Sequence, residues 1–211
     1  MDKHDFDLEA LVASAVADAD LSGQDIPAID LYLDQIITLA SDRLAQNKRG
    51  EKDKLLTKTM INNYSKDGII KPVKGKKYSR EQIVQMMLVY SLKQNFSIGE
   101  IKQLFDGVYA AEDFDGDALI ESYDRFLAFK AHERTVCPGM VEGLFAAQGL
   151  DMQNDRDFFV GLLGISAMST YFRNIAQDML ALRYPLPEKE KEKDKDKKDK
   201  DKKDKDKEKQ K

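Results

Sequence analysis

The segment between Thr57 and Gly68 constrains the fold most, because it marks both ends of one short helix. Threonine offers the side-chain oxygen that caps a helix start, and glycine suits the left-handed residue that follows a helix end. The sequence therefore predicts a helix over residues 58–66. The apolar residues of this segment fall on one face: Leu56, Met60, Ile61 and Tyr64. The polar residues share the opposite face by helical spacing: Thr59, Asn62, Asn63 and Lys66.

The residues after this helix predict a hairpin and two further helices. Residues 69–78 place β-branched side chains around Pro72 and Gly75, which favours a small β-hairpin. Two capping boxes follow, and each marks a helix start: Ser79 with Gln82, and Ser97 with Glu100. The first of these helices should run for about fifteen residues with an inward apolar face: Ile83, Val84, Met86, Met87 and Tyr90. A short helix followed by a hairpin and a helix pair is the order of a winged helix-turn-helix.

The remaining chain is also predicted to be mostly α-helical, with little β-structure. Apolar spacing indicates helices within residues 6–19 and 29–44, with a polar linker over 47–54. Beyond the helix pair, helices are expected near residues 118–134, 139–148 and 155–183. We divide the chain into four parts: an N-terminal arm (1–24), a winged helix-turn-helix domain (25–108), a helical effector or dimerisation domain (109–187) and a disordered charged tail (188–211).

Charge is distributed very unevenly along the chain. Residues 48–80 carry eleven Lys and Arg and three Asp and Glu, whereas residues 1–47 carry two and ten, and residues 81–187 carry eight and fifteen. A basic island inside an acidic protein is the electrostatic pattern of a polyanion-binding site. The whole-chain net charge of −4 conceals this island.

Double-stranded DNA is the polyanion that this arrangement favours. A short helix fits the major groove, where asparagine amides can read adenine and a threonine can meet a thymine methyl group or a phosphate. The basic wing over residues 69–78 would lie on the phosphate backbone, where lysines fix the register of the protein on the duplex. The candidate DNA-binding residues are Lys58, Thr59, Asn62, Asn63, Lys66, Lys71, Lys74, Lys76, Lys77, Tyr78 and Arg80. Two alternatives stay open: a solvated basic face on a structural domain, and a protein-interaction adaptor without DNA affinity.

Three motifs resemble a bacterial family of unknown function, which itself resembles the DNA-binding domain of MerR-type transcriptional regulators. The first is Tyr64 with Gly68-Ile69, the second is Lys76 with Tyr78-Ser79, and the third is Phe96-Ser97-Ile98 with Ile101. The resemblance covers roughly residues 25–108 and implies a DNA-binding fold and a transcriptional regulator. The chain departs from the MerR pattern at Asn62-Asn63, because MerR proteins have an arginine before the recognition-helix tyrosine. No sustained heptad is evident after the domain, where MerR proteins carry a dimerising coil.

Apolar residues occupy nearly all sides of the predicted helix over residues 155–183. Such a helix is covered by the neighbouring helices, or it forms a two-fold interface or a pocket for a small effector. A DNA reader usually needs two half-sites, so a homodimer is expected.

Other functions find little support in the residues. Cys137 is the only cysteine, no nucleotide-binding loop or catalytic carboxylate pair is present, and we expect neither an enzyme nor a cofactor. Residues 113–124 approach a calcium-binding loop, but Ala118 stands where the turn needs glycine and Asp124 where the loop needs glutamate. An interdomain loop whose Asp117 caps a helix explains the same residues and is favoured over a calcium site. The longest uncharged run, residues 158–172, is too short to span a bilayer, and a cytoplasmic protein is expected.

Overall fold

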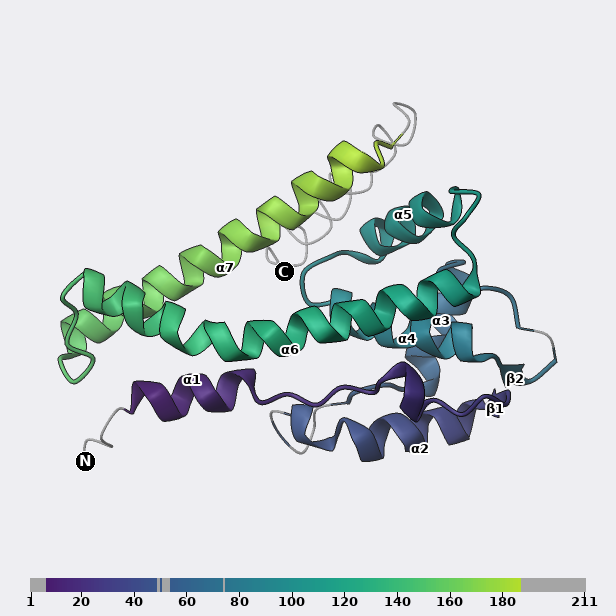
Figure 1. The fold of residues 1–211 in the computed structure, drawn as a ribbon, viewed down its shortest axis with the longest axis horizontal. Helices are drawn as coiled ribbons and strands as arrows, with labels where there is room; N and C mark the ends of the chain where they lie inside the picture. The colour runs from purple at the N-terminus through teal and green to yellow at the C-terminus, as the bar shows by residue number, and fades with distance from the viewer. Residues whose placement is uncertain (1–6, 49, 51–53, 74, 187–211) are drawn as a thin grey trace, which may run out of the picture.

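The computed structural model describes residues 7–48, 50, 54–73 and 75–186, and the chain in them is mostly helical (Figure 1). The expected disordered tail over residues 188–211 lies outside the described residues. The α-helices are α1 (Leu8–Val16), α2 (Leu33–Arg43), α3 (Lys58–Lys66), α4 (Arg80–Leu92), α5 (Ile98–Tyr109), α6 (Gly116–Ala147) and α7 (Asp155–Arg183). Two short 3₁₀ helices occupy Gly23–Asp25 and Ala45–Asn47. The strands are β1 (Leu31–Tyr32) and β2 (Lys77–Tyr78).

Helix α4 forms the centre of the protein. Six consecutive residues, from Gln82 to Met87, are buried, so this helix has neighbours on all sides rather than the single apolar face expected from its sequence. The main cluster of buried hydrophobic residues surrounds α4 and runs along the chain from Leu21 to Tyr123. We call residues 21–126 the head.

The two strands pair with each other across a long stretch of chain. Leu31 lies opposite Tyr78 and Tyr32 opposite Lys77, in antiparallel register. The helix expected over residues 29–44 therefore begins later, at Leu33, because the residues before it are extended and bonded to β2. Ile29, expected on the inner face of that helix, is 70% exposed.

Helix α6 is longer than the sequence indicated. We expected two helices separated at Pro138, but one helix runs through that proline from Gly116 to Ala147. A proline removes one backbone hydrogen bond, and packing on both sides of the break can offset that loss. Before Pro138, Lys130 and Arg134 bind Asp18 and Asp20 in the segment that follows α1. After Pro138, Phe145 packs close to Gly161 of α7.

The distal part of α6 and the first part of α7 project from the head as a helical hairpin, and α7 then runs back toward α5 (Figure 1). We call residues 127–183 the arm. The C-terminal end of α7 returns to α5, where Gln177 donates to Glu100 at 3.0 Å and Gln103 donates to the Tyr184 carbonyl at 2.5 Å. Within the described residues, no helix is both long and apolar enough to cross a membrane.

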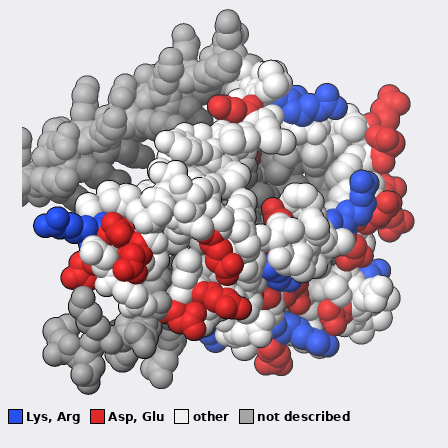
Figure 2. Space-filling model, turned by 60° about the vertical axis from the view of Figure 1, so that its left-hand side comes forward, with Lys and Arg blue, Asp and Glu red and all other residues white. Residues whose placement is uncertain are grey.

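Most of the arm is not covered by the rest of the described chain. Of the eighteen large hydrophobic residues that are exposed in the described chain, fifteen lie on α6 and α7. The space-filling view that brings the hairpin end forward is correspondingly dominated by uncharged residues (Figure 2). Internal packing, one of the expectations for α7, therefore accounts for little of this helix, on which only Gly161 and Leu180 are buried.

Candidate nucleic-acid interface

Helix α3 has the bounds and the two faces predicted from its sequence. Thr57 accepts a hydrogen bond from the Met60 amide at 3.2 Å and caps the helix start. Leu56, Ile61 and Tyr64 are buried and fix the helix on the head. Burial raises the pKa of the Tyr64 hydroxyl, so this side chain stays neutral in the core.

The opposite face of α3 is exposed. It consists of Lys58, Thr59, Asn62, Asn63 and Lys66. Within the described residues, none of these five side chains forms a hydrogen bond or an ion pair. The face therefore presents two amides, a hydroxyl and two ammonium groups to a ligand.

The end of α3 turns the chain sharply toward α4. Gly68 has φ of 71°, a left-handed conformation that glycine adopts without strain. The next two amides, of Ile69 and Ile70, both donate to the Tyr64 carbonyl, at 2.9 and 3.3 Å. Both isoleucine side chains are buried, so this turn is a fixed part of the head.

The hairpin expected over residues 69–78 does not form in the described residues. Side chains of α4 bind the backbone that would have made its first strand. The Lys71 amide donates to Gln85 at 3.0 Å, and Gln82 donates to the carbonyls of Lys71 and Pro72 at 2.9 and 3.1 Å. The second half of the segment pairs with β1 instead. The wing is therefore a loop held between α4 and β1, with Gly75 at φ of 78°.

Three of the candidate DNA-binding side chains are used inside the protein. Lys71 binds Glu81 at 2.6 Å and lies 3.9 Å above the Tyr109 ring. The Arg80 guanidinium donates to the Gly23 carbonyl from its Nε at 3.1 Å. Tyr78 is 8% exposed and belongs to the buried cluster. Residue type and charge predicted that these three side chains contact DNA. In the structure they lie at the base of the wing and bind other parts of the protein.

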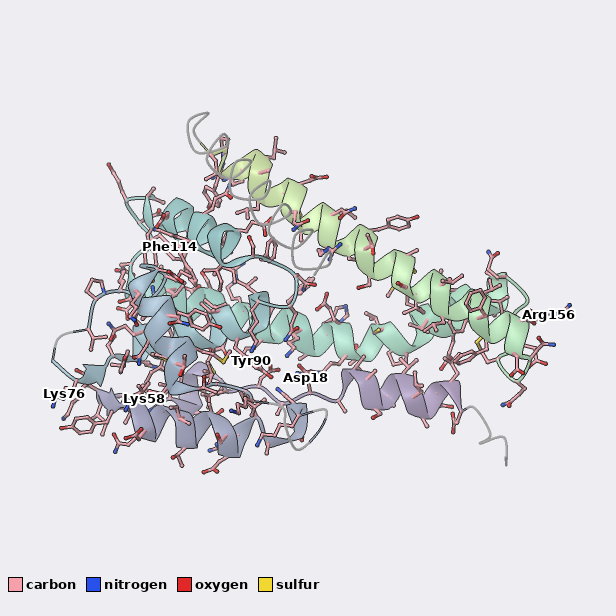
Figure 3. All side chains as sticks on the ribbon, turned by 180° about the vertical axis from the view of Figure 1, so that it is seen from behind. Asp18, Lys58, Lys76, Tyr90, Phe114 and Arg156 are labelled. Atoms are coloured by element: carbon pink, nitrogen blue, oxygen red, sulfur yellow. The ribbon has the colours of Figure 1, made fainter. Side chains whose placement is uncertain are left out.

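The other candidate residues of the wing lie at its surface. Lys76 and Lys77 are exposed, and the Lys77 ammonium lies 5.0 Å from the Tyr32 ring across the two strands. Lys74 lies outside the described residues. Lys58 of α3 and Lys76 of the wing lie at the same end of the molecule, while Arg156 of the arm lies at the other (Figure 3).

A polar network beneath the wing was not predicted from the sequence. The Tyr109 hydroxyl donates to Glu81 at 2.9 Å and accepts from Gln85 at 3.1 Å, so one tyrosine joins α4 and α5 under Lys71. Burial and the Glu81 carboxylate together raise the pKa of Tyr109 well above its usual range. The two glutamines at Gln82 and Gln85, three residues apart in an otherwise apolar helix, are the sequence signal that could have indicated it.

The acidic segment over residues 113–124 is mostly helical, because α6 begins at Gly116. Asp115, rather than Asp117, caps α6 and accepts from the amides of Asp117 and Ala118. The rest of the segment is helical, and Asp124 accepts from the Gly23 amide at 2.9 Å. Among the described residues, no group of three or more His, Cys, Asp or Glu side chains is arranged to hold a metal ion.

Comparison with known proteins places the head in one family. No curated protein and no solved structure matches the chain. The family described as Domain of unknown function (DUF1836) matches residues 21–126, half of the chain and the whole of the head. The chain therefore belongs to the DUF1836 family.

Proposed function

We propose that this protein is a DNA-binding transcriptional regulator whose head reads double-stranded DNA. Helix α3 lies in the major groove and the wing lies on the phosphate backbone. One observation carries the proposal: α3 is fixed by a buried face and presents an opposite face of five polar or basic side chains without partners in the described chain.

The chemistry of this face suits a duplex. A nine-residue helix fits the width of the major groove, and an asparagine amide pairs with an adenine edge through two hydrogen bonds. Asn62 and Asn63 are therefore the residues proposed to read bases. Lys58, Lys66, Lys76 and Lys77 are proposed to contact phosphates, which gives affinity and register rather than sequence preference.

The internal contacts of Lys71, Tyr78 and Arg80 give these residues a supporting role in the proposal. They hold the base of the wing against α4, α5 and the 3₁₀ helix at Gly23–Asp25. The proposed contact set is thus smaller than the one that charge alone predicts, and it retains Lys74 as a prediction.

The similarity to MerR-type regulators supports the proposed fold more than the proposed contacts. Its motif residues Tyr64, Tyr78 and Ile101 are all buried in the head. The order of α3, the wing, α4 and α5 supports a helix-turn-helix arrangement, with a loop in place of the expected hairpin. The exposed residues of α3 are where the chain departs from the MerR pattern, so a different base sequence is expected to be recognised.

A charge-reversal experiment tests the proposal. Binding of the full chain to a mixed-sequence duplex is measured by fluorescence anisotropy at several salt concentrations, with K76E/K77E as the test variant. We expect binding that weakens with salt, and a slope of log affinity against log salt reduced by about 1 to 2 in the variant. The matched control R156E/R173E changes the same charge at the arm and should bind as the unaltered protein does.

Two results would oppose the proposal. Duplex binding that is absent, or that is independent of salt, would favour an adaptor that uses the same basic face for an acidic protein. Equal weakening by the head and arm variants would mean that net charge, rather than this face, governs binding.

A further inference from the structure

The arm carries an apolar seam that nothing in the described chain covers. On α7 the residues Phe172, Ile175, Met179 and Leu182 follow one another at spacings of three, four and three, so they form one stripe along the helix. Their exposed fractions are 56%, 54%, 66% and 87%. We call these four residues the seam.

The seam continues a stripe that the protein already uses for helix packing. Counting backward at the same spacing gives Met168, Ile165, Gly161 and Phe158. Gly161 is buried, and a side chain at that position would meet Met152 and Phe145 of the hairpin. Phe158 and Ile165 are 39% and 37% exposed, so the hairpin covers the first half of the stripe only in part, and the seam is more exposed still.

We infer that the seam is the contact by which two copies of this chain form a dimer. Apolar residues at alternating spacings of three and four are the pattern by which helices pair with one another. The pattern is also compatible with itself in an antiparallel two-fold arrangement. A two-fold axis on the seam side of α7, at the height of residue 177, places Phe172 opposite Leu182 of the second copy, and Ile175 opposite Met179, so every seam residue meets another seam residue.

The exposed apolar area limits how much of such a contact the seam can form by itself. At roughly 150 Å² for a large apolar side chain, the exposed fractions of the seam correspond to about 400 Å² on each copy. The remaining exposed hydrophobic residues of the arm bring its total to about 1,200 Å², but they lie on several sides of α6 and α7. A stable interface buries about 800 Å² on each partner, so the seam supplies about half of that area and other arm residues on the same side have to supply the rest.

The face that meets α5 leaves the seam accessible. Gln177 and Tyr184 carry the contacts with α5, and Leu180 is buried on that side. At 100° per residue these positions lie on a different side of α7 from the seam. The inference does not require DNA binding, although a dimer would supply the two half-sites that a palindromic operator needs.

Sedimentation equilibrium of the full chain tests whether the seam binds a second copy of the chain. We expect a mass near twice the 24.0 kDa of the chain, and a mass near one chain for the variant I175E/M179E. The control L162E changes an arm residue that is 57% exposed and lies off the seam, and it should remain a dimer. A wild-type monomer at all concentrations, or a dimeric I175E/M179E variant that keeps its helical circular dichroism, would overturn the inference.

Cysteine cross-linking tests the antiparallel arrangement. In a C137S background, chains carrying F172C and chains carrying L182C are co-expressed and oxidised, and we expect a disulfide only between unlike chains. The ten-residue offset separates two copies of the same position by about 15 Å, so neither variant should cross-link with itself. A cross-link between two F172C chains would indicate a parallel pair and would overturn the proposed geometry, while leaving the DNA experiment unaffected.

Discussion

The head and the arm both contain many large apolar residues, yet the head buries them and the arm leaves most of them exposed. In the head, α4 is surrounded, and Ile83, Val84 and Met86 are 0% exposed. In the arm, α7 is longer and carries large residues on nearly every side, but among its large apolar side chains only Leu180 is buried. The difference teaches that burial depends on how many elements surround a helix, because a hairpin of two helices cannot cover both of its own outer faces.

The largest expected effect tests this contrast directly. Met86→Ala removes a fully buried side chain from α4 and should lower the free energy of unfolding by about 2 to 5 kcal/mol. Leu162→Ala in the arm, at 57% exposure, should change it by only about 0.5 kcal/mol. Urea unfolding followed by circular dichroism measures both, and equal losses would contradict the contrast.

The next effect concerns buried polar side chains. Among the described residues, the two buried polar side chains, Gln82 and Gln85, both belong to the head. Gln85→Leu leaves the Lys71 amide without its acceptor and removes the donor to the Tyr109 hydroxyl, so a loss of about 1 to 3 kcal/mol is expected. The same change at the exposed Gln148 of the hairpin should have little effect. Equal unfolding midpoints for the two variants would show that the network beneath the wing contributes nothing to stability.

Removing a helix cap should cost the same stability in the head and in the arm, because a cap acts only on its own helix end. Thr57 caps α3 in the head, and Asn154 caps α7 in the arm by accepting from the amides of Arg156 and Asp157. Thr57→Ala and Asn154→Ala should each cost about 1 kcal/mol, as measured by thermal unfolding. A far larger loss at Thr57 would mean that α3 depends on its cap more than on its buried face.

The smallest effect lies in the ion pairs that join the segment after α1 to α6. Burial alone would raise the pKa of Asp18, but hydrogen bonds from Lys130 and Arg134 outweigh it and lower the value. A lowered carboxyl pKa stabilises the fold above the unfolded value of 3.8 and ceases to do so as pH falls through the folded value. Asp18→Asn should therefore cost about 1 kcal/mol or less at neutral pH, with the difference disappearing in acid. An acid titration of unfolding for both proteins checks the sign.

Local rules account for the parts of the fold that were predicted. The bounds of α3 follow from Thr57 and Gly68, and the capping boxes at Ser79 and Ser97 mark the starts of α4 and α5. Each of these features involves residues within one helical turn of each other. The exposed face of α3 was predicted for the same reason, since helical spacing alone places its polar residues together.

Contacts between distant residues account for what was missed. Strand β2 pairs with Leu31 and Tyr32 rather than with the adjacent chain, and no local pattern indicates so remote a partner. Lys71 and Arg80 have the same charge as Lys76 and Lys77, yet Glu81 and the Gly23 carbonyl bind the former pair. Charge patterns reveal a basic surface but not which of its members the fold has already engaged.

The proline inside α6 has a consequence for any assembly built on the arm. Pro138 has no amide hydrogen, so the Arg134 carbonyl, four residues earlier, receives no helical hydrogen bond. Arg134 is also the last residue of α6 that is tied to the segment after α1. The helix thus lacks one backbone hydrogen bond at the point where its last ion pairs to the segment after α1 are made. In a pair of chains held together by α7, the direction of α6 beyond this point would set the separation of the two α3 helices. That separation would fix the operator spacing, for which one helical turn of DNA is about 34 Å.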